Sequence, residues 1–117
     1  MKFMITIYDN DTSERAFAGA ERDEFERVHG STIGELMASG ELVHSSELDL
    51  DGAKVVRVTD GRTTVTDGPF TEGREVVGGY YLVDVAGVDR AVEIASRFVE
   101  ARYCPIEVRA LVEYEPS

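Results

Sequence analysis

The sequence has almost no cysteine and no long apolar run. Cys104 is the only cysteine among the 117 residues, so the chain can form neither an internal disulfide nor a cysteine-based zinc site. No apolar run approaches membrane-spanning length, and Asp9-Asn10-Asp11 interrupts the N-terminal apolar run before it could serve as a signal peptide. We therefore expect a cytoplasmic protein that does not enter a membrane.

Positive charge is also scarce. Twelve Lys and Arg face 23 Asp and Glu, which gives a formal charge of −11 at pH 7. Such a chain repels the phosphate backbone of nucleic acids and anionic membrane surfaces, so we expect neither as a partner. What remains is an ordinary globular composition, with 43% hydrophobic and 30% charged residues. Its length fits a single domain over residues 1–117.

Strand-like and helix-like segments alternate along the chain. The patterns predict strands at residues 3–8, 42–48, 53–59, 63–66, 76–85 and 106–114, and helices at about 16–39 and 89–102. Asp60-Gly61, between two β-rich runs, is the strongest hairpin signal. The order is βαβ, an additional hairpin, then βαβ. This order predicts an α+β fold of ferredoxin-like type, with an antiparallel sheet and both helices on one face.

Two of the predicted strands are apolar on both faces. In residues 3–8 and 76–85, apolar side chains occupy both alternate sets of positions. Helices can cover only one face of the sheet, so the other would expose an apolar patch. A second copy of the chain is the simplest partner that could bury this face, and we therefore expect a homodimer.

Several motifs, in the expected order, resemble the YCII-related family in its DGPF-type branch. They are MKFMITIY at residues 1–8, RVTDGR at 57–62, VTDGPF at 65–70, GGYYLVDV at 78–85 and IEVR at 106–109. The resemblance implies that two ferredoxin-like subunits pair into a dimeric α/β barrel. It also implies an active site of one His and one Asp, which fall here on His29 and Asp67. It does not imply one reaction, because proteins with this barrel include lyases, isomerases and cofactor-poor oxygenases.

His29 and Asp67 each have a plainer interpretation. His29 falls on the apolar arc of the first predicted helix, where a histidine is often only a hydrogen-bonded core residue. Asp67 precedes Gly68-Pro69, a combination that is typical of turns. If the two side chains meet, the carboxylate would orient the imidazole and tune it as a general acid or base.

Tyr8 and Phe70 are candidates for ligand binding because they adjoin the ends of predicted strands. Aromatic residues on strands are more often plain core, and that alternative stays open. His44 has no acidic or histidine neighbour at ligand spacing. We therefore expect neither a metal site nor a cofactor.

Two functions fit these observations. The first is a small-molecule enzyme or ligand binder that uses His29 as general acid or base and Asp67 as its orienting partner, acting on a small organic ligand. The second is a non-catalytic dimeric regulatory or interaction module in which both residues are structural. A cavity lined by both side chains would favour the first function, and a filled core around His29 would favour the second.

Overall fold

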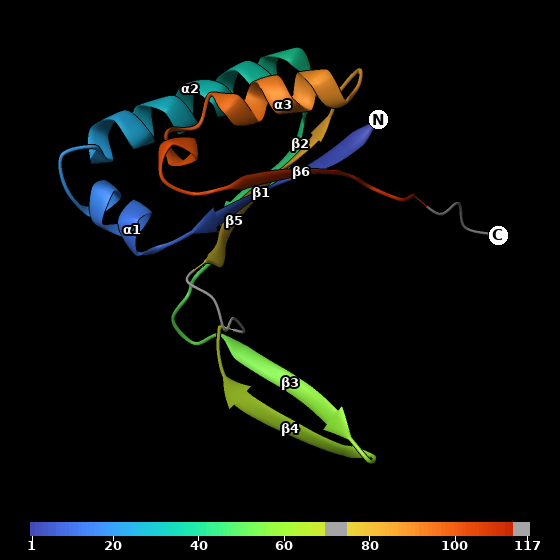
Figure 1. Cartoon of the computed structure of the whole chain (residues 1–117). Coiled ribbons are helices and arrows are strands. Elements are labelled where there is room, and N and C mark those ends of the chain that lie inside the picture. Colours follow the sequence, from blue (N-terminus) through green and yellow to red (C-terminus); the bar gives the residue numbers. More distant parts are fainter. Residues whose placement is uncertain (70–74, 114–117) are drawn as a thin grey trace.

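A four-stranded antiparallel sheet carries a layer of helices on one face, and a separate two-stranded hairpin projects away from this body (Figure 1). The computed structural model describes residues 1–69 and 75–113. In chain order, the elements are β1 (Lys2–Asp9), α1 (Asp11–Ala18), α2 (Arg22–Ser39), β2 (Leu42–Glu47), β3 (Lys54–Thr59), β4 (Arg62–Asp67), β5 (Val76–Asp84), α3 (Val88–Ser96), the 3₁₀ turn η1 (Val99–Arg102) and β6 (Ile106–Ala110). None of the helices in these two stretches is long and apolar enough to span a bilayer.

The sheet has the strand order β2-β5-β1-β6, and all neighbouring strands run antiparallel. Ile5 of β1 lies opposite Tyr81 of β5 on one side and Val108 of β6 on the other. The hairpin β3–β4 is inserted between β2 and β5. These strand positions and directions are consistent with a ferredoxin-like fold, so the predicted α+β class is confirmed.

The core lies between the sheet and the helices. Along β1 the side chains of Phe3, Ile5 and Ile7 are buried, whereas their alternating neighbours are only half-buried. Leu36 of α2 and Ile94 of α3 are fully buried against this face. The period-two alternation of β1 therefore separates a helix-covered face from a face that the described residues leave partly open.

The first helical segment differs from the prediction. The structure has α1 and α2 where the sequence predicted one helix over about residues 16–39. Asn10 and Ser13 form a capping box that starts α1 early, and α1 ends before Gly19. The first helix therefore begins at Asp11, before the predicted start near residue 16, because the cap satisfies the first free amides.

The second helix is also shorter than predicted, because α3 ends at Ser96 rather than near residue 102. Phe98 has an extended backbone, with ψ 134°, and its side chain is only 2% exposed. The chain then makes the short turn η1 before β6. The last strand ends at Ala110 instead of residue 114, which lies outside the described residues.

Gly78 and Gly79 lie inside β5, as predicted for a central strand. A Cβ atom at Gly78 would overlap the carboxylate of Asp9. A Cβ atom at Gly79 would lie 3.0 Å from the backbone oxygen of Ser46 on β2. A side chain at position 78 would therefore displace the Asp9 carboxylate, and one at position 79 would crowd the backbone of β2.

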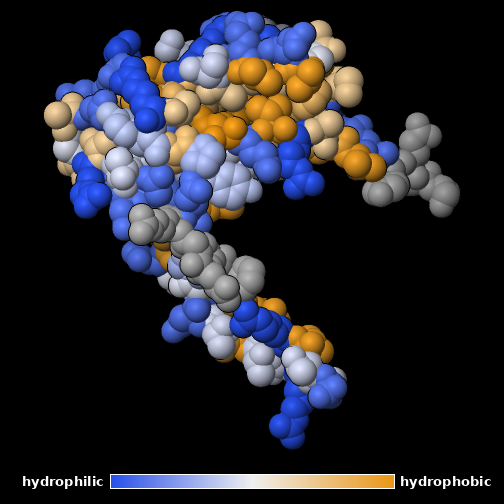
Figure 2. All heavy atoms as spheres, in the orientation of Figure 1, coloured by the Kyte–Doolittle hydropathy of each residue, from blue (hydrophilic) through white to orange (hydrophobic). Residues whose placement is uncertain are grey.

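The predicted hairpin is present, and most of its surface is exposed. Val56 and Val65 are opposite each other and are 62% and 58% exposed, and Val58 on the same face is 67% exposed. Figure 2 shows apolar atoms on the projecting hairpin. An isolated two-stranded hairpin is marginally stable in water. Within the described part of the chain, no layer covers this valine face.

The burial difference between Leu36 and Met37 gives a test of the core. Leu36 is 0% exposed and Met37 is 66% exposed, although they are neighbours on α2. We expect Leu36→Ala to lower the free energy of unfolding by about 2–5 kcal/mol, because it leaves a cavity. Met37→Ala should stay within about 0.5 kcal/mol of wild type. Urea unfolding followed by circular dichroism measures both, and equal losses would contradict this core.

Candidate functional site

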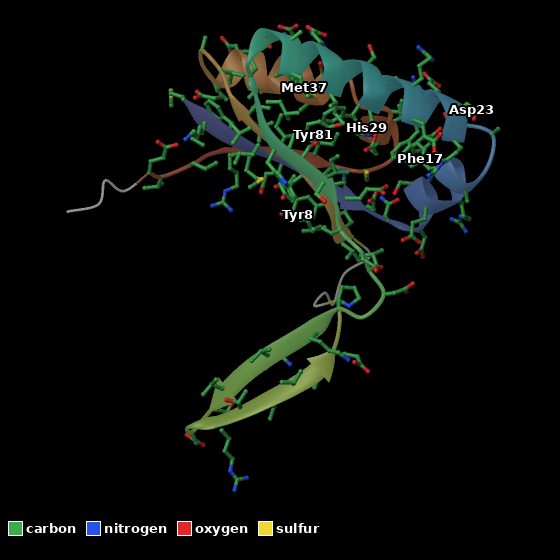
Figure 3. The ribbon with its side chains drawn as sticks, turned by 180° about the vertical axis from the view of Figure 1, so that it is seen from behind. Tyr8, Phe17, Asp23, His29, Met37 and Tyr81 are labelled. Atoms are coloured by element: carbon green, nitrogen blue, oxygen red, sulfur yellow. The ribbon has the colours of Figure 1, made fainter. Side chains whose placement is uncertain are left out.

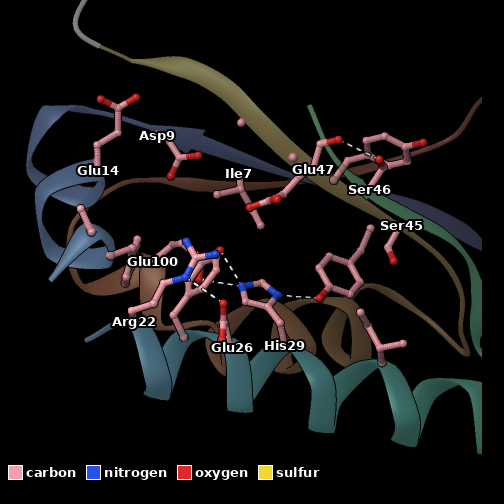
Figure 4. A pocket seen from close by; sticks show the side chains of 18 residues that line it. Ile7, Asp9, Glu14, Arg22, Glu26, His29, Ser45, Ser46, Glu47 and Glu100 are labelled. Carbon is pink, nitrogen blue, oxygen red and sulfur yellow. Dashed lines mark hydrogen bonds and ion pairs between the residues drawn. The ribbon is translucent and has the colours of Figure 1, made fainter. Parts of the chain in front are cut away.

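A cavity of about 610 Å³ lies between the helices α1 and α2 and the adjoining strands β2 and β5 (Figure 4). Its apolar wall is formed by Ile7, Phe17, Phe25 and Ile33. Its polar wall includes His29, Tyr81 and several carboxylates. The cavity therefore combines an apolar surface with a few ionisable groups, as ligand sites usually do.

His29 is held by hydrogen bonds at both ring nitrogens. Its Nε2 lies 2.7 and 2.9 Å from the two carboxylate oxygens of Glu100, and its Nδ1 lies 2.6 Å from the hydroxyl oxygen of Tyr81. The side chain of Glu100 is 3% exposed and that of His29 is 16% exposed. A buried carboxylate needs such a partner, because an unpaired charge is costly away from water.

Three elements bring these side chains together. His29 points from α2 toward the sheet, and Tyr81 points from β5 toward the helices, as Figure 3 shows. Glu100 reaches the ring because α3 ends early and η1 turns the chain back beneath α2. The ring of Phe98 stacks on His29 with centroids 4.9 Å apart and so fixes its orientation.

The three groups form a chain of proton carriers. An ionised Glu100 only accepts hydrogen bonds, so Nε2 of His29 carries a proton. In the neutral imidazole, Nδ1 then accepts the hydrogen bond that the Tyr81 hydroxyl donates. Burial, aided by the charge of Glu100, raises the pKa of Tyr81, so its hydroxyl stays protonated. If His29 becomes charged, Nδ1 donates to Tyr81 instead, and the Tyr81 proton is free to face the cavity.

Asp9 lies at the edge of the same cavity. The Ser13 hydroxyl donates to its carboxylate at 3.2 Å. Burial raises the pKa of Asp9, and the charges of Glu100, Glu14 and Glu47 raise it further, against the opposing effect of the Ser13 bond. The site is therefore acidic as well as apolar.

The structure does not bring Asp67 to His29 within one chain. Asp67 lies at the end of β4, where its side chain is 86% exposed and pairs with the Lys54 ammonium at 2.5 Å. Gly68 follows it, and the cavity lining does not include Asp67. The carboxylate that meets His29 in this chain is Glu100. A catalytic role for Asp67 stays a prediction.

Of the two predicted ligand-binding aromatics, Tyr8 does not line the cavity. Tyr8 lies on the face of the sheet opposite the helices, where its hydroxyl is 3.5 Å from Glu107 (Figure 3). Phe70 lies outside the described residues. His44 also lies on the face that the helices leave open, with its Nδ1 2.7 Å from the Tyr80 hydroxyl. Over residues 1–69 and 75–113 no group of three metal-ligating side chains is close enough to hold an ion.

Glu100 is a site residue that the sequence did not indicate. The apolar stripe of residues 89–102 predicted a continuous helix, on which Glu100 had no assigned role. The helix instead breaks after Ser96, and this break buries Glu100. The only local signal is the acidic residue directly after the apolar pair Phe98-Val99.

Comparison with known proteins gives two findings. The family model described as the YCII-related domain matches residues 1–115. An uncharacterized protein of Rhizobium meliloti (strain 1021) is 29% identical over 120 residues, which cover 100% of this chain and 97% of that protein. The similarity thus extends over the sheet, the helices and the hairpin.

Replacing the two carboxylates separately tests which of them supports His29. Glu100→Ala should lower the free energy of unfolding at pH 7 by about 1–3 kcal/mol, because it leaves the Nε2–H of His29 without its acceptor in a buried place. Glu100→Gln should cost less, since the amide oxygen can still accept from Nε2. Asp67→Ala should stay within about 1 kcal/mol of wild type, as expected for an exposed pair. Chemical denaturation measures all three, and a larger loss for Asp67→Ala would contradict the assignment.

Proposed function

This chain belongs to the YCII-related family, and we propose that it is an enzyme or binding protein for a small organic molecule. The observation that supports the proposal is the cavity of about 610 Å³ lined by His29, Tyr81 and Glu100. Ligand pockets commonly have volumes of about 300–1,000 Å³ and combine apolar walls with a few placed polar groups. The cavity contains His29 but not Asp67, so it supports a role for His29 alone; a filled core would have favoured a purely structural histidine.

His29 acts in this proposal as the general acid or base, and Glu100 is its orienting partner. Both ring nitrogens are already bonded, so the group that meets the ligand is the Tyr81 hydroxyl. A ligand proton passes to the Tyr81 oxygen as the Tyr81 proton passes to Nδ1 of His29. Glu100 stabilises the imidazolium that results. The reverse transfer returns a proton to the product or ligand.

We also propose that the chain is a DGPF-type member that works as a homodimer, in which two sheets pack face to face as a dimeric α/β barrel. The sequence Asp67-Gly68-Pro69-Phe70 supports the branch. Two features support the dimer. The open sheet face carries the half-buried side chains of Met4 and Leu82, and the hairpin exposes its valine face. Asp67 could join the site only where the hairpin meets another copy. A cytoplasmic location stays a prediction.

Sedimentation tests the dimer. Burial of both apolar surfaces should give a particle of twice the 12.9 kDa chain mass at micromolar concentration. Leu82→Lys, which places a charge on the open sheet face, should shift the protein toward the monomer. Met37→Lys provides the control, because Met37 is exposed on α2, on the other side of the sheet. A wild-type protein that sediments only as a monomer would overturn the dimer.

A thermal-shift screen against a metabolite library tests the ligand proposal. A ligand at about 100 times its dissociation constant stabilises the native state by about 2.7 kcal/mol. We expect a specific compound to raise the Tm of wild type and of Met37→Ala by several degrees. Tyr81→Phe, which removes only one hydroxyl, should weaken the shift and abolish turnover if the compound reacts. No shift with any compound, or an unchanged response in both Tyr81→Phe and His29→Gln, would contradict the proposal.

A further inference from the structure

The charges around the cavity are unevenly compensated. On the α2 side, Arg22 pairs with Glu26 at 2.8 Å and His29 pairs with Glu100 at 2.7 Å. Asp9, Glu14 and Glu47 lie across the cavity from these pairs (Figure 4). None of these three carboxylates has a basic partner among residues 1–69 and 75–113. Among the described residues, one end of the cavity is therefore neutralised and the other carries unbalanced negative charge.

Asp9 is fixed in position at this negative end. The Ser13 hydroxyl donates to one of its oxygens, and the carboxylate packs on the backbone of Gly78, where a side chain would displace it. The side chain is half-buried, and the neighbouring charges of Glu100, Glu14 and Glu47 disfavour its ionised form, so the pKa of Asp9 is raised. A cation placed beside Asp9 would relieve both effects, because opposite charges attract strongly where water is partly excluded.

The rest of the cavity wall restricts the shape and polarity of the molecule that carries the positive charge. Phe17 is buried and Phe25 is half-buried, and their rings are 4.6 Å apart on the apolar wall. Ser45 of β2 contributes a small polar side chain, and Tyr81 contributes the hydroxyl that contacts His29. A compact apolar or aromatic body fits this wall, with a polar group reaching toward Tyr81.

We propose that the ligand of this cavity is an organic cation, such as a small amine that is protonated at neutral pH. Its ammonium group lies among Asp9, Glu14 and Glu47, and its apolar body lies against Phe17 and Phe25. This inference rests on the proposed function, since it names the substrate class of the same site. Carboxylate and phosphate ligands are disfavoured here because the uncompensated carboxylates repel them.

Three probes of matched shape test the charge preference. 2-Phenylethylamine, 2-phenylethanol and 3-phenylpropionate share a phenylethyl body and carry a positive, a neutral and a negative end. NMR titration of the wild-type protein gives their dissociation constants and shows which residues they contact. We expect the amine to bind roughly tenfold more tightly than the alcohol, with the carboxylate weakest, and shifts at Ile7 and Phe25. Added salt should reduce the preference.

Two variants locate the source of the preference. Asp9→Asn keeps the side-chain shape and the acceptor for Ser13, and should bring the amine to within about twofold of the alcohol without changing the affinity for the alcohol. Glu47→Gln, on the exposed side of β2, should reduce the preference in part. Asp60→Asn removes the same charge at the hairpin turn, where φ is 52° and Asn is tolerated. This control should keep the wild-type preference.

The outcomes separate the two proposals. Equal or tighter binding of the alcohol or the carboxylate, no contact with cavity residues by any of the probes, or an equal effect of Asp60→Asn and Asp9→Asn would overturn the cation inference. The proposed function would stand in those cases if the library yields a ligand that depends on His29 and Tyr81. Conversely, a preference for the amine that Asp9→Asn removes would support the inference even if Tyr81→Phe leaves every ligand response unchanged.

Discussion

The pairing of buried Glu100 with His29 is the interaction on which the site depends. Glu100 is almost fully enclosed, and both of its oxygens are directed at one imidazole nitrogen. Leaving this carboxylate without a partner would cost several kcal/mol of stability. The pair therefore holds α2 and η1 in a fixed relative position. Tyr81 extends the same constraint to β5. One buried charge thus ties a helix, a 3₁₀ turn and a central strand around one end of the cavity.

The same pairing determines what the cavity can do. Because both ring nitrogens of His29 are already hydrogen-bonded, the ring is poorly placed to contact a ligand directly. It can instead exchange a proton with the Tyr81 hydroxyl. The compensated pairs on α2 leave the opposite wall, around Asp9, with the unbalanced charge. In the function that we propose, recognition and proton transfer therefore take place at different walls: the carboxylates attract the cation, and the Tyr81 hydroxyl meets the group that reacts or hydrogen-bonds.

Much of the fold follows from local patterns. Short apolar runs rich in β-forming residues located the strands, and Asp60-Gly61 located the hairpin turn, because these signals depend on neighbouring residues alone. Helix ends were less predictable. The cap at Asn10 starts α1 early, and the extended backbone of Phe98 follows the end of α3, although an apolar stripe continues through that position. Glu100 was missed for this reason: its burial arises from a break that helical spacing does not reveal.

Asp67 shows the opposite limit, since its local position was predicted correctly but the expected contact with His29 does not form within one chain. Its place at the end of β4 follows from hairpin register, which pairs it with Lys54. Where the whole hairpin docks is set by surfaces that no local pattern describes. The hairpin carries three basic residues (Lys54, Arg57 and Arg62) and two acidic ones (Asp60 and Asp67), which makes it net positive in a chain of charge −11. Its exposed valines favour contact with an apolar surface and its net charge favours an acidic one, and in the proposed dimer a second copy of the chain supplies both.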